Sequence, residues 1–488
     1  MPRSTTLNLP DMKITLFAMN GSYAHSSLAI RALRDALQTA GFADVALLEA
    51  TLRDRRSEVL SKLVAERCEI YGFSCYIWNI REMLSLAEDL RAVHPHCRIV
   101  LGGPEVSFAP ERFTALPFVD TVITGEGEEA IVSVARAARA GEPLPRLVVG
   151  TPDPHFAEAG IHYRVEEPTA SLVYYESSRG CPFTCAFCLS SATAGVRAKS
   201  AELALAELRQ FEAFSAPFTV KLVDRTFNFD RERAKKIWRG LLSPEYTKCY
   251  HFEVCAALLD EESFDILAKF PAGKVRLEIG LQSTNEKTLA AISRHTDAEK
   301  VLAAARRLTE MGNVHVHLDL IAGLPHEDMA SFRRSFDAAY FACHVLQPGF
   351  LKLLHGTALR RDAEAYGIRF SATPPYTVLE TDCLSFEELC RLEELAELLE
   401  RLRDRGRFER ALDFLLKRLP SPFDFYDGFS AYLREETGRE VQKISQRDLF
   451  THLAAFGAGL LSPEDGATFK ALLRQDFAAA EVRKPPVF

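Results

Sequence analysis

The feature that most constrains the fold of this 488-residue chain is a regular alternation of short apolar runs with amphipathic segments of helical period. In the first third of the chain, the apolar runs lie at 13–19, 44–48, 69–75, 98–101 and 121–124. The segments between them, such as 28–40 and 80–93, repeat apolar residues at helical spacing. Alternating strands and helices predict a parallel sheet covered by helices on both faces. We therefore expect residues 1–150 to form a doubly wound, Rossmann-like α/β domain.

The alternation stops at residues 151–171, which contain three prolines and mixed charge and are expected to form a linker. It then resumes, with strand-like runs at 172–176, 218–224, 251–256, 275–281, 314–321 and 345–354. Six strand–helix repeats predict a complete or partial (β/α) barrel of the TIM type over residues 172–365. Over residues 366–488 the pattern is helical, as at 386–403 and 408–419, and predicts a helical C-terminal domain.

The composition is typical of a soluble globular protein. Hydrophobic residues make up 47% of the chain, charged residues 26%, and the formal net charge is -8. A nucleic-acid partner would require a basic surface. No apolar run approaches the roughly 18 residues of a membrane span, and the polar start does not resemble a secretory signal. We therefore expect a cytoplasmic protein with no nucleic-acid and no membrane partner. Most of the eleven cysteines are scattered singly, which is typical of small buried hydrophobes.

Three cysteines, Cys181, Cys185 and Cys188, form a C-x₃-C-x₂-C motif in a loop directly after a strand-like run. Three thiolates at this spacing can bind three corners of one cubane iron–sulfur cluster. Such a set leaves one iron open to a small molecule, for example to the amino and carboxylate groups of an amino acid. A structural zinc site is an alternative, but it normally has four protein ligands, and no fourth cysteine or histidine follows nearby. A chance grouping of three cysteines is the remaining alternative.

This motif, with the aromatic Phe187 before its last cysteine, resembles the cluster-binding motif of the radical S-adenosylmethionine (SAM) superfamily. The resemblance implies a [4Fe–4S] cluster on the three cysteines, with an open iron that chelates SAM. It also implies that an electron from the cluster cleaves SAM to a 5′-deoxyadenosyl radical. That electron would come from a reductase, a flavodoxin or a ferredoxin.

Later segments resemble barrel strands of the same superfamily. Residues 277–283 resemble a strand that helps to bind the nucleoside of SAM, and residues 319–325 resemble the strand end against which adenine packs. The contacts to SAM that the resemblance implies are Phe187, Asp224, Glu253, Glu278, Gln282, Gly323 and Pro325. The Gly-Gly-Glu element of the family is absent near Asp224, so its contact with the methionine amine is a hypothesis. For the two glutamates and the glutamine, a buried hydrogen bond is the alternative to ligand contact.

A doubly wound domain ahead of such a barrel resembles the cobalamin-binding subfamily of radical SAM enzymes. The matching pieces are residues 71–79, 101–105 and 125–128, which carry glycines or aromatic residues after predicted strands. Ligands of an open parallel sheet bind beyond the carboxyl ends of its strands. The contacts to cobalamin that the resemblance implies are Asn20, Tyr23, Ser74, Tyr76, Trp78, Gly102, Gly103, Glu105, Gly125 and Glu126.

The corrin ring is expected on the carboxyl ends of the sheet, with apolar area from Tyr76 or Trp78; a buried core tryptophan is the alternative. Many cobalamin domains carry D-x-H-x-x-G, whose histidine binds cobalt, and this sequence lacks that motif. We therefore expect base-off cobalamin without a protein nitrogen below the cobalt. The nucleotide tail would lie between the loops at 20–23 and 102–105. His25 is the local candidate if a histidine does bind cobalt.

The resemblance covers residues 12–357 and leaves the reaction open. The first hypothesis is methylation of an unactivated carbon of a small molecule through methylcobalamin. The second is a radical cyclisation, rearrangement or oxidation with the same cofactors. The third is a cobalamin or iron–sulfur sensor without turnover. Candidate substrate contacts near the strand ends are Lys352, His355 and Tyr376.

A radical methylthiotransferase is a competing interpretation, because these enzymes also carry a domain before the barrel. Their extra domain binds a second cluster through three cysteines. Cys68, Cys75 and Cys97 are available in number here, but none lies on the glycine-rich loops. Those enzymes also end in a small basic β domain, whereas this chain ends in helical patterns.

Overall fold

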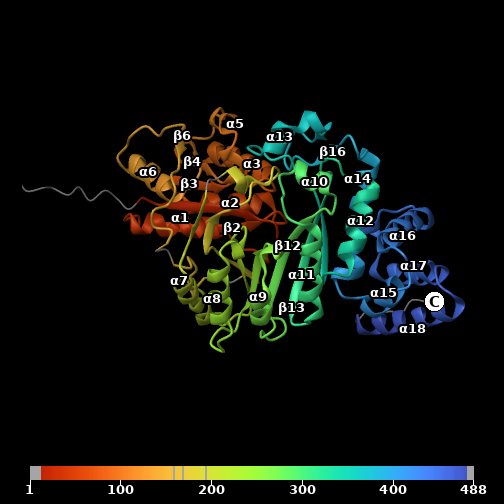
Figure 1. Ribbon diagram of the computed structural model, residues 1–488. Helices are drawn as coiled ribbons and strands as arrows, with labels where there is room; N and C mark the ends of the chain where they lie inside the picture. The colour runs from red at the N-terminus through yellow and green to blue at the C-terminus, as the bar shows by residue number, and fades with distance from the viewer. Residues whose placement is uncertain (1–11, 158–159, 168–169, 193–194, 481–488) are drawn as a thin grey trace, which may run out of the picture.

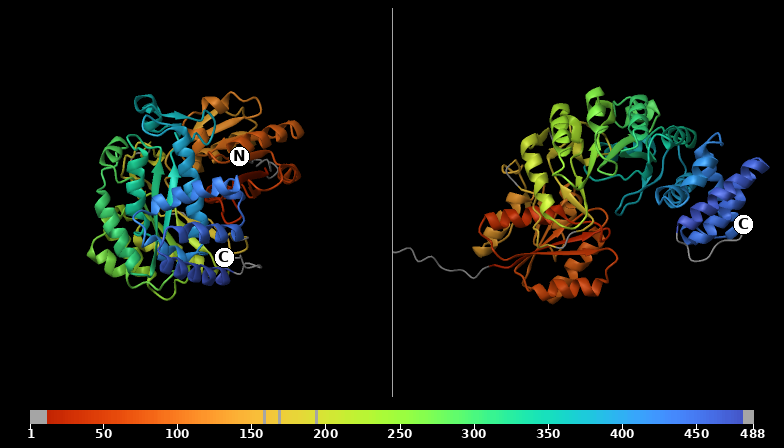
Figure 2. Two further views of the ribbon diagram at one scale, coloured as in Figure 1. Left: turned by 90° about the vertical axis from the view of Figure 1, so that its right-hand side faces the viewer. Right: turned by 90° about the horizontal axis from the view of Figure 1, so that it is seen from below.

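The chain folds into two parallel sheets surrounded by helices, followed by a group of C-terminal helices. The computed structural model describes residues 12–480, apart from 158–159, 168–169 and 193–194. The two sheets lie next to each other, and the C-terminal helices lie beyond the second sheet, away from the first (Figures 1 and 2).

The N-terminal sheet has six parallel strands in the order β2-β1-β3-β4-β5-β6. The strands are β1 (Ile14–Asn20), β2 (Val45–Thr51), β3 (Ile70–Ser74), β4 (Arg98–Gly102), β5 (Thr121–Thr124) and β6 (Leu147–Val149). The helices are α1 (Leu28–Thr39), α2 (Arg56–Glu66), α3 (Ile80–Val93), α4 (Pro104–Ser107), α5 (Glu111–Thr114) and α6 (Glu128–Arg139). One face packs on α2 and α3 through Leu63 and Met83, the other on α1 and α6 through Ile30 and Ile131. The predicted doubly wound domain is confirmed; the pattern did not predict β6.

The sheet grows from β1 in two directions: β2 lies on one side of β1, and β3 with the later strands lies on the other. Strand β1 pairs with β2 on one side and with β3 on the other, so consecutive crossovers lie on opposite faces of the sheet. A doubly wound sheet binds its ligands in the crevice at such a point, outside the carboxyl ends of the strands. Asn20 and Ser74 end the two strands that border this crevice.

The second sheet also has six parallel strands, in the order β14-β13-β12-β11-β10-β7. The strands are β7 (Leu172–Tyr175), β10 (Thr219–Leu222), β11 (Cys249–Val254), β12 (Val275–Gln282), β13 (Val314–Ala322) and β14 (Val345–Phe350). Within the described part of the chain, the edge strands β7 and β14 do not pair with each other. Of the two predicted forms of the barrel, the structure therefore has the partial one.

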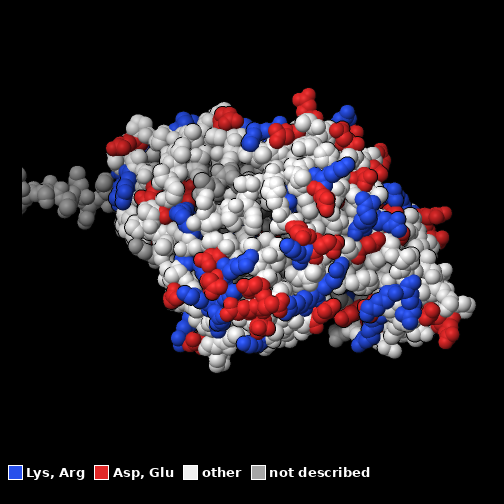
Figure 3. Space-filling model, in the orientation of Figure 1, with Lys and Arg blue, Asp and Glu red and all other residues white. Residues whose placement is uncertain are grey.

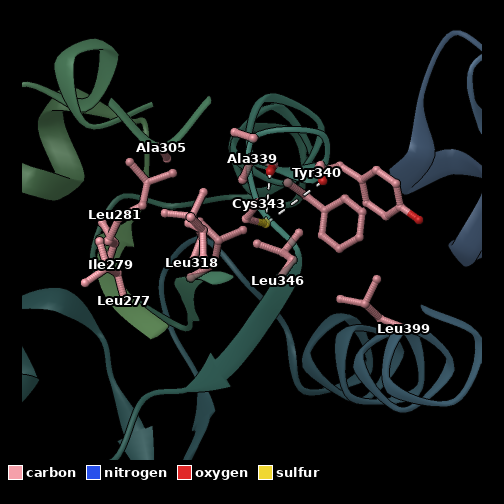
Figure 4. Packing of buried hydrophobic residues seen from close by; sticks show 14 of the residues in the cluster. Leu277, Ile279, Leu281, Ala305, Leu318, Ala339, Tyr340, Cys343, Leu346 and Leu399 are labelled. Carbon is pink, nitrogen blue, oxygen red and sulfur yellow. Dashed lines mark hydrogen bonds between the residues drawn. The ribbon is translucent and has the colours of Figure 1, made fainter. Parts of the chain in front are cut away.

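Helices cover the outer face of this open barrel. They are α7 (Ala201–Gln210), α8 (Arg231–Leu241), α9 (Glu261–Leu267), α11 (Ala298–Glu310) and α12 (Met329–Tyr340). Two short helices, α10 (Glu286–Ala291) and α13 (Ala358–Arg361), lie at the carboxyl end of the strands (Figure 1). Alternate residues of the strands pack against the covering helices: Figure 4 shows Ile279 of β12 and Leu318 of β13 in this layer with Ala339 of α12. The intervening residues of the same strands, such as Glu278 and Asp319, face the lumen. The inner face of the barrel, which borders the lumen, is therefore polar, and its outer face is apolar.

The C-terminal part begins with a short antiparallel hairpin, β15 (Arg369–Phe370) and β16 (Val378–Glu380). Its helices are α14 (Phe386–Leu399), a π-helical turn at Glu400–Asp404, α15 (Glu409–Leu416), α16 (Pro422–Thr437), α17 (Gln446–Gly459) and α18 (Pro463–Ala479). A capping box of Ser385 and Glu388 starts α14, where the sequence predicted a helix. The hairpin lies back toward the N-terminal domain, whereas α15 to α18 lie on the opposite side (Figure 1).

Acidic and basic side chains are interspersed over the barrel helices on the face that Figure 3 shows. Several form ion pairs, such as Lys235 with Asp260 at 2.7 Å and with Glu262 at 2.7 Å. Among the helices of the described residues, none has the length and apolar character needed to cross a membrane.

Candidate active site

The three clustered cysteines lie on a loop that a small hairpin closes. Strand β8 (Ser178–Gly180) pairs antiparallel with β9 (Val196–Ala198), and the cysteines follow β8 directly. Gly180 has a φ of 96°, and a Cβ on it would lie 2.1 Å from the carbonyl oxygen of Gly195. A glycine is required here, because another residue would force the two strands of the hairpin apart.

The loop is fixed to the barrel on both sides. The Ala186 backbone amide donates to the Ile292 carbonyl (2.9 Å), and the Leu359 amide donates to the Ala186 carbonyl (2.9 Å). Cys185 is buried, whereas Cys181 and Cys188 are half-buried. Phe187 packs against the barrel core. The cysteine loop is therefore held at the carboxyl end of the barrel strands.

A basic side chain lies next to the cysteines. The Arg294 guanidinium Nη1 is 3.8 Å from the Cys185 Sγ. Burial raises the pKa of the Cys185 thiol, and the positive charge of Arg294 partly offsets that effect. The Cys181 Sγ lies 3.6 Å from the Thr226 Oγ1. Three thiols on one loop beside a guanidinium suit an anionic iron–sulfur cluster, which the charge of Arg294 would stabilise.

Three side chains that can accept hydrogen bonds, Asp319, Gln282 and Glu253, face the lumen below this loop. The protein supplies few donors to them. Asp319 has no hydrogen bond or ion pair among the described residues, and the Gln282 Oε1 is buried without a partner. Glu253 has one ion pair, a 3.7 Å contact with the Lys221 Nζ. Burial, and then the negative charges of Glu278 and Glu253, raise the pKa of Asp319 to about 8. A ligand with several donors, such as an amine and ribose hydroxyls, would satisfy these acceptors.

Glu278 is instead already paired. It accepts from the Lys221 Nζ at 2.7 Å and contacts the His251 Nε2 at 2.9 Å. Burial tends to raise the pKa of Glu278, but the hydrogen bonds with His251 and Lys221 outweigh it and hold the pKa at about 2. For Glu278 the buried hydrogen bond, one of the two alternatives from sequence, is what the structure shows.

Asp224 also has its partners within the protein. It is fully buried and accepts from the Ser177 amide at 2.9 Å, the Ser177 hydroxyl at 2.6 Å and the Ser178 hydroxyl at 2.9 Å. Burial raises the pKa of its carboxyl against these hydrogen bonds. Instead of pointing to a ligand amine, Asp224 fixes the start of the hairpin that carries the cysteines. Sequence alone placed Asp224 at a strand end but could not show which way its side chain points.

The strand end at Gly323 turns sharply. Gly323 has a φ of 87°, and its missing side chain leaves room for Val378 of the hairpin at 3.4 Å from an ideal Cβ. Pro325 is buried beyond it. Their predicted contact with adenine remains a prediction.

A cavity of about 680 Å³ lies between the carboxyl ends of the N-terminal sheet and the barrel. Eight of the ten predicted cobalamin contacts line it: Asn20, Ser74, Tyr76, Trp78, Gly102, Gly103, Gly125 and Glu126. The rings of Tyr76 and Trp78 are stacked with centroids 4.3 Å apart, and Trp78 is 51% exposed. Trp78 is therefore not the buried core tryptophan that the sequence left as an alternative.

The cavity continues inward between the sheet and two helices. Its deep walls are apolar and come from β1, β3, β4, β5, α1 and α6: Leu16, Gly72, Val100, Ile123, Leu33 and Ile131. Its outer wall comes from the barrel and includes Tyr174, Glu176, Arg179 and Arg225. The shape suits a flat ring at the mouth and an extended tail in the channel, so the residues present fit cobalamin.

Two predicted cobalamin contacts lie outside this cavity. Tyr23 is 67% exposed and hydrogen-bonds with Asp54. Glu105 is buried, accepts from the Tyr376 hydroxyl and lies 3.8 Å from the Arg112 guanidinium. Both follow the correct strands, but their side chains turn away from the crevice. We therefore correct the expectation that these two residues contact the cofactor.

The predicted substrate contacts are distributed differently from the expectation. Tyr376 and His355 both hydrogen-bond with the Arg112 Nη1 of the N-terminal domain, at 2.9 and 2.8 Å. Lys352 is exposed. Two of the three residues therefore join the hairpin region to the N-terminal domain.

Sequence reasoning missed Asp319 and Arg179. The signal for Asp319 was present, since 314–320 alternates apolar and polar residues, and a strand of a purely structural barrel would be apolar on both faces. Arg179 precedes Gly180 in the cluster motif, but its carboxylate partners lie about fifty residues earlier in the other domain. No local pattern reveals such a pair.

Cys68, Cys75 and Cys97 are buried in the hydrophobic core between the N-terminal sheet and its helices. Within the described residues, no group of three His, Cys, Asp or Glu side chains is arranged to hold a single metal ion. A cubane differs from a single ion, because each of its ligands binds a different iron.

Comparison with protein families finds matches in three parts of the chain. Residues 15–135 match the B12 binding domain, and residues 175–339 match the radical SAM superfamily. Residues 364–487 match a family described as "Protein of unknown function (DUF4080)".

Two curated relatives are each 27% identical to this chain over 54% of its length. One is the 2-(S-pantetheinyl)-carbapenam-3-carboxylate methyltransferase of Streptantibioticus cattleyicolor. The other is the cobalamin-dependent radical SAM methyltransferase TokK of Streptomyces tokunonensis. The match covers 44% of each relative, so this chain spans less than half of their length.

Among solved structures, the fold is similar to that of the cobalamin-dependent SAM radical enzyme OxsB with aqua-cobalamin and SAM bound. The TM-score is 0.61 at 15% identity, and the alignment covers 96% of this chain and 84% of OxsB. Both domains and their order agree with a set of three cofactors, a [4Fe–4S] cluster, SAM and cobalamin. The chain thus carries a B12 binding domain followed by a radical SAM domain, the combination that the sequence resemblance predicted.

Proposed function

We propose that this protein methylates an unactivated carbon of a small molecule, with SAM as the source of both the radical and the methyl group. One observation carries the proposal: residues of the barrel and of the cobalamin domain line the same cavity, next to the cysteine loop. Glu176 and Arg179, which lead into the cluster motif, share this cavity with Tyr76 and Trp78. A substrate bound there would lie between the two reactive centres.

The chain's own residues would hold the cofactors. Cys181, Cys185 and Cys188 would bind the cluster, with the Arg294 charge beside them. When bound, the cluster supplies the electron that cleaves SAM, and cobalamin carries the methyl group. The lumen acceptors Gln282 and Asp319, and Glu253 with its single 3.7 Å ion pair, would take the amine and ribose donors of SAM and so fix its position.

The cobalamin would lie with its tail in the apolar channel and its ring against the stacked pair of Tyr76 and Trp78. Gly72 widens the channel at its floor, because a Cβ there would lie 2.8 Å from the Leu16 side chain. The apolar walls would exclude water from the ring and so protect reactive intermediates from side reactions with water.

The test is an anaerobic assay of the reconstituted protein with SAM, dithionite and cobalamin. We expect 5′-deoxyadenosine, and S-adenosylhomocysteine that appears only when cobalamin is present. Cys185→Ala should make neither product above background. It should still bind cobalamin, since the Cys185 thiol does not line the cobalamin cavity. In extracts that supply the substrate, a product heavier than that substrate by one methylene group would identify carbon methylation.

Each alternative has its own outcome in this assay. Formation of 5′-deoxyadenosine without S-adenosylhomocysteine would instead favour a radical cyclisation, rearrangement or oxidation. Equal traces from the wild type and Cys185→Ala would favour a sensor without turnover.

The cobalt ligation has an independent test. His25 lines the cavity, but its Nδ1 is 2.6 Å from the Tyr174 hydroxyl, and burial lowers its pKa. We expect base-off cobalamin without a protein nitrogen ligand, so the cobalt(II) EPR spectrum should show no nitrogen superhyperfine splitting. Splitting that disappears in His25→Ala would contradict this expectation.

A further inference from the structure

Two carboxylates of the cobalamin domain, Glu126 and Glu128, contact the stem of the cysteine loop, and Glu126 is the one that contacts both of its strands. Arg179 of β8 and Arg197 of β9 are register partners, directly opposite each other across the hairpin. The Arg179 Nη1 donates to Glu126 at 2.6 Å, and the Arg197 Nη2 donates to its other oxygen. Glu126 belongs to the loop between β5 and α6. One carboxylate from the cobalamin domain thus bridges both strands that close the cluster loop.

The bridge is partly shielded from water, least at Arg197, whose side chain is 38% exposed. The side chains of Arg179 and Glu126 are 17% and 27% exposed. Arg179 also donates to Glu128 at 2.5 Å and to Glu176 at 2.9 Å. Phe156 lies under both arginines. Partly buried guanidinium–carboxylate pairs with several hydrogen bonds are far stiffer than exposed ion pairs.

The loop that carries Glu126 also lines the cobalamin cavity. Gly125, Glu126 and Gly127 all contribute to its wall. Gly125 has a φ of 75°, and a Cβ on Gly150 would lie 1.8 Å from the Glu126 carbonyl oxygen. This loop is therefore packed tightly against the next strand and has little freedom to move independently of its arginine partners.

We infer that Glu126 is a positioning residue that links the two cofactor sites, so that cobalamin in its cavity tightens SAM binding at the cluster. The inference rests on the proposed function for the identity of the two ligands. Because the 125–127 loop does not move independently of Arg179 and Arg197, a cofactor that packs against this loop also restrains the stem of the cysteine loop. By thermodynamic linkage, SAM must then tighten cobalamin binding by the same factor.

The experiment measures this factor directly. Cluster-loaded protein is titrated anaerobically with SAM, with and without saturating hydroxocobalamin, and the dissociation constant of SAM is measured. We expect cobalamin to lower that constant at least about fivefold in the wild type, the low end of allosteric coupling. In Glu126→Gln the factor should fall well below the wild-type value, because a neutral amide cannot hold two guanidinium groups and only the Arg179 contact with Glu128 remains. Glu129→Gln is the matched control, since Glu129 is an exposed carboxylate at the same end of α6, and it should keep the wild-type factor.

The outcomes separate the inference from the proposed function. A wild type that binds both ligands without coupling, or Glu126→Gln with the wild-type factor, overturns the inference and leaves the proposed function standing. A wild type that does not bind cobalamin overturns both. If Glu126→Gln loads no cluster, Arg197→Gln replaces it: Arg197 is 38% exposed, and the variant retains the Arg179 contact. Its factor should then lie between one and the wild-type value, and an unchanged factor overturns the inference.

Discussion

At the scale of single residues, the inner face of the barrel distinguishes ligand-binding groups from structural ones. Neighbouring strands place Glu253 opposite Glu278, and Glu278 opposite His317. Glu278 is satisfied by Lys221, whereas Asp319 on the next layer has no such partner among the described residues. An unsatisfied acceptor in a lumen is costly to maintain, so a ligand that supplies a donor is the simplest physical account of Asp319.

Asp319→Asn should change the protons released when SAM binds. Asp319 has a pKa of about 8 and is mostly protonated at neutral pH in the free protein. The positive charge and donors of SAM favour the ionised carboxylate, so binding releases a proton from the wild type. The asparagine variant has no proton to lose there. Calorimetry of SAM binding in buffers of different ionisation enthalpy should show a release smaller by up to one proton. Equal release from both proteins would mean that SAM does not meet Asp319.

Glu327→Gln should change how stability depends on pH. Glu327 is fully buried, and burial raises its pKa to about 8 against the hydrogen bond from Ser283. The folded state therefore keeps a proton that the unfolded state loses at about pH 4.5, so stability falls as pH rises from there to about 8.

The variant removes this loss, which is at most about 5 kcal/mol since each pKa unit corresponds to about 1.4 kcal/mol. Its melting temperature should exceed that of the wild type at about pH 8 and approach it at about pH 5. A constant difference across this range would show that Glu327 titrates normally.

At the scale of elements, the β8–β9 hairpin depends on one glycine. In Gly180→Ala, the new methyl group would lie 2.1 Å from the carbonyl oxygen of Gly195, which directly precedes β9 and cannot move without disturbing the pairing. We expect the iron content after reconstitution to fall by about half or more, while cobalamin binding remains, because a local clash of this kind disrupts the hairpin before the distant sheet.

Gly141→Ala is the control for backbone strain alone. Gly141 has a φ of 73°, but no atom lies within 4 Å of its ideal Cβ. This variant should load iron like the wild type. Iron loss in both variants would mean that general instability, and not the hairpin, limits cluster assembly.

The sequence predicted the elements whose pattern reflects burial and missed those that tertiary contacts hold. Strands such as β12 and β13 were predictable because their outer faces are fully apolar. The three-residue strands β6, β8 and β9 were not, because they are too short to show a period. Whether the barrel closes was also undetermined, since that depends on pairing between the first and last strands.

The same limit applies to the site. Position after a strand predicted eight cavity residues, because the carboxyl ends of parallel strands meet at one edge. It could not predict side-chain direction, so Tyr23 and Glu105 were placed in the cavity although they turn away. Partners far apart in sequence, such as Arg179 and Glu126, have no local signature at all.

At the scale of the whole molecule, the C-terminal hairpin returns to the cobalamin domain while the other helices continue away from it (Figures 1 and 2). The Arg81 guanidinium of α3 hydrogen-bonds with Thr373, and a Cβ on Gly356 would lie 2.3 Å from the Phe108 ring. Together with the Glu126 bridge, these contacts hold the N-terminal domain against the rest of the chain at two places. The cavity itself is lined by the N-terminal domain and by the first part of the barrel, so these two parts need to dock correctly for a substrate to fit between the cofactors.

Tyr376→Phe tests the contact between the C-terminal hairpin region and the N-terminal domain. The Tyr376 hydroxyl donates to the buried carboxylate of Glu105 and accepts from the Arg112 Nη1 at 2.9 Å. Removing the hydroxyl leaves Glu105 without its hydrogen bond, with the charges of Arg112 at 3.8 Å and of Arg360 still acting on it, and an unsatisfied buried acceptor costs about 1–3 kcal/mol. We expect a lower melting temperature and faster proteolysis in residues 371–375. Cobalamin affinity should be unchanged, because Glu105 lies outside the cavity.

Tyr366→Phe is the matched control for this prediction. Tyr366 is half-buried with its ring against His326, and its hydroxyl makes no hydrogen bond within the described residues. Its loss should leave both melting temperature and proteolysis near wild type, because no buried group loses a donor. A loss of cobalamin affinity in Tyr376→Phe, absent in Tyr366→Phe, would mean that Glu105 does contact the cofactor. The geometry argues against this result: the left-handed turn at Gly103 (φ 111°) packs on Cys75 and directs Glu105 toward the hairpin.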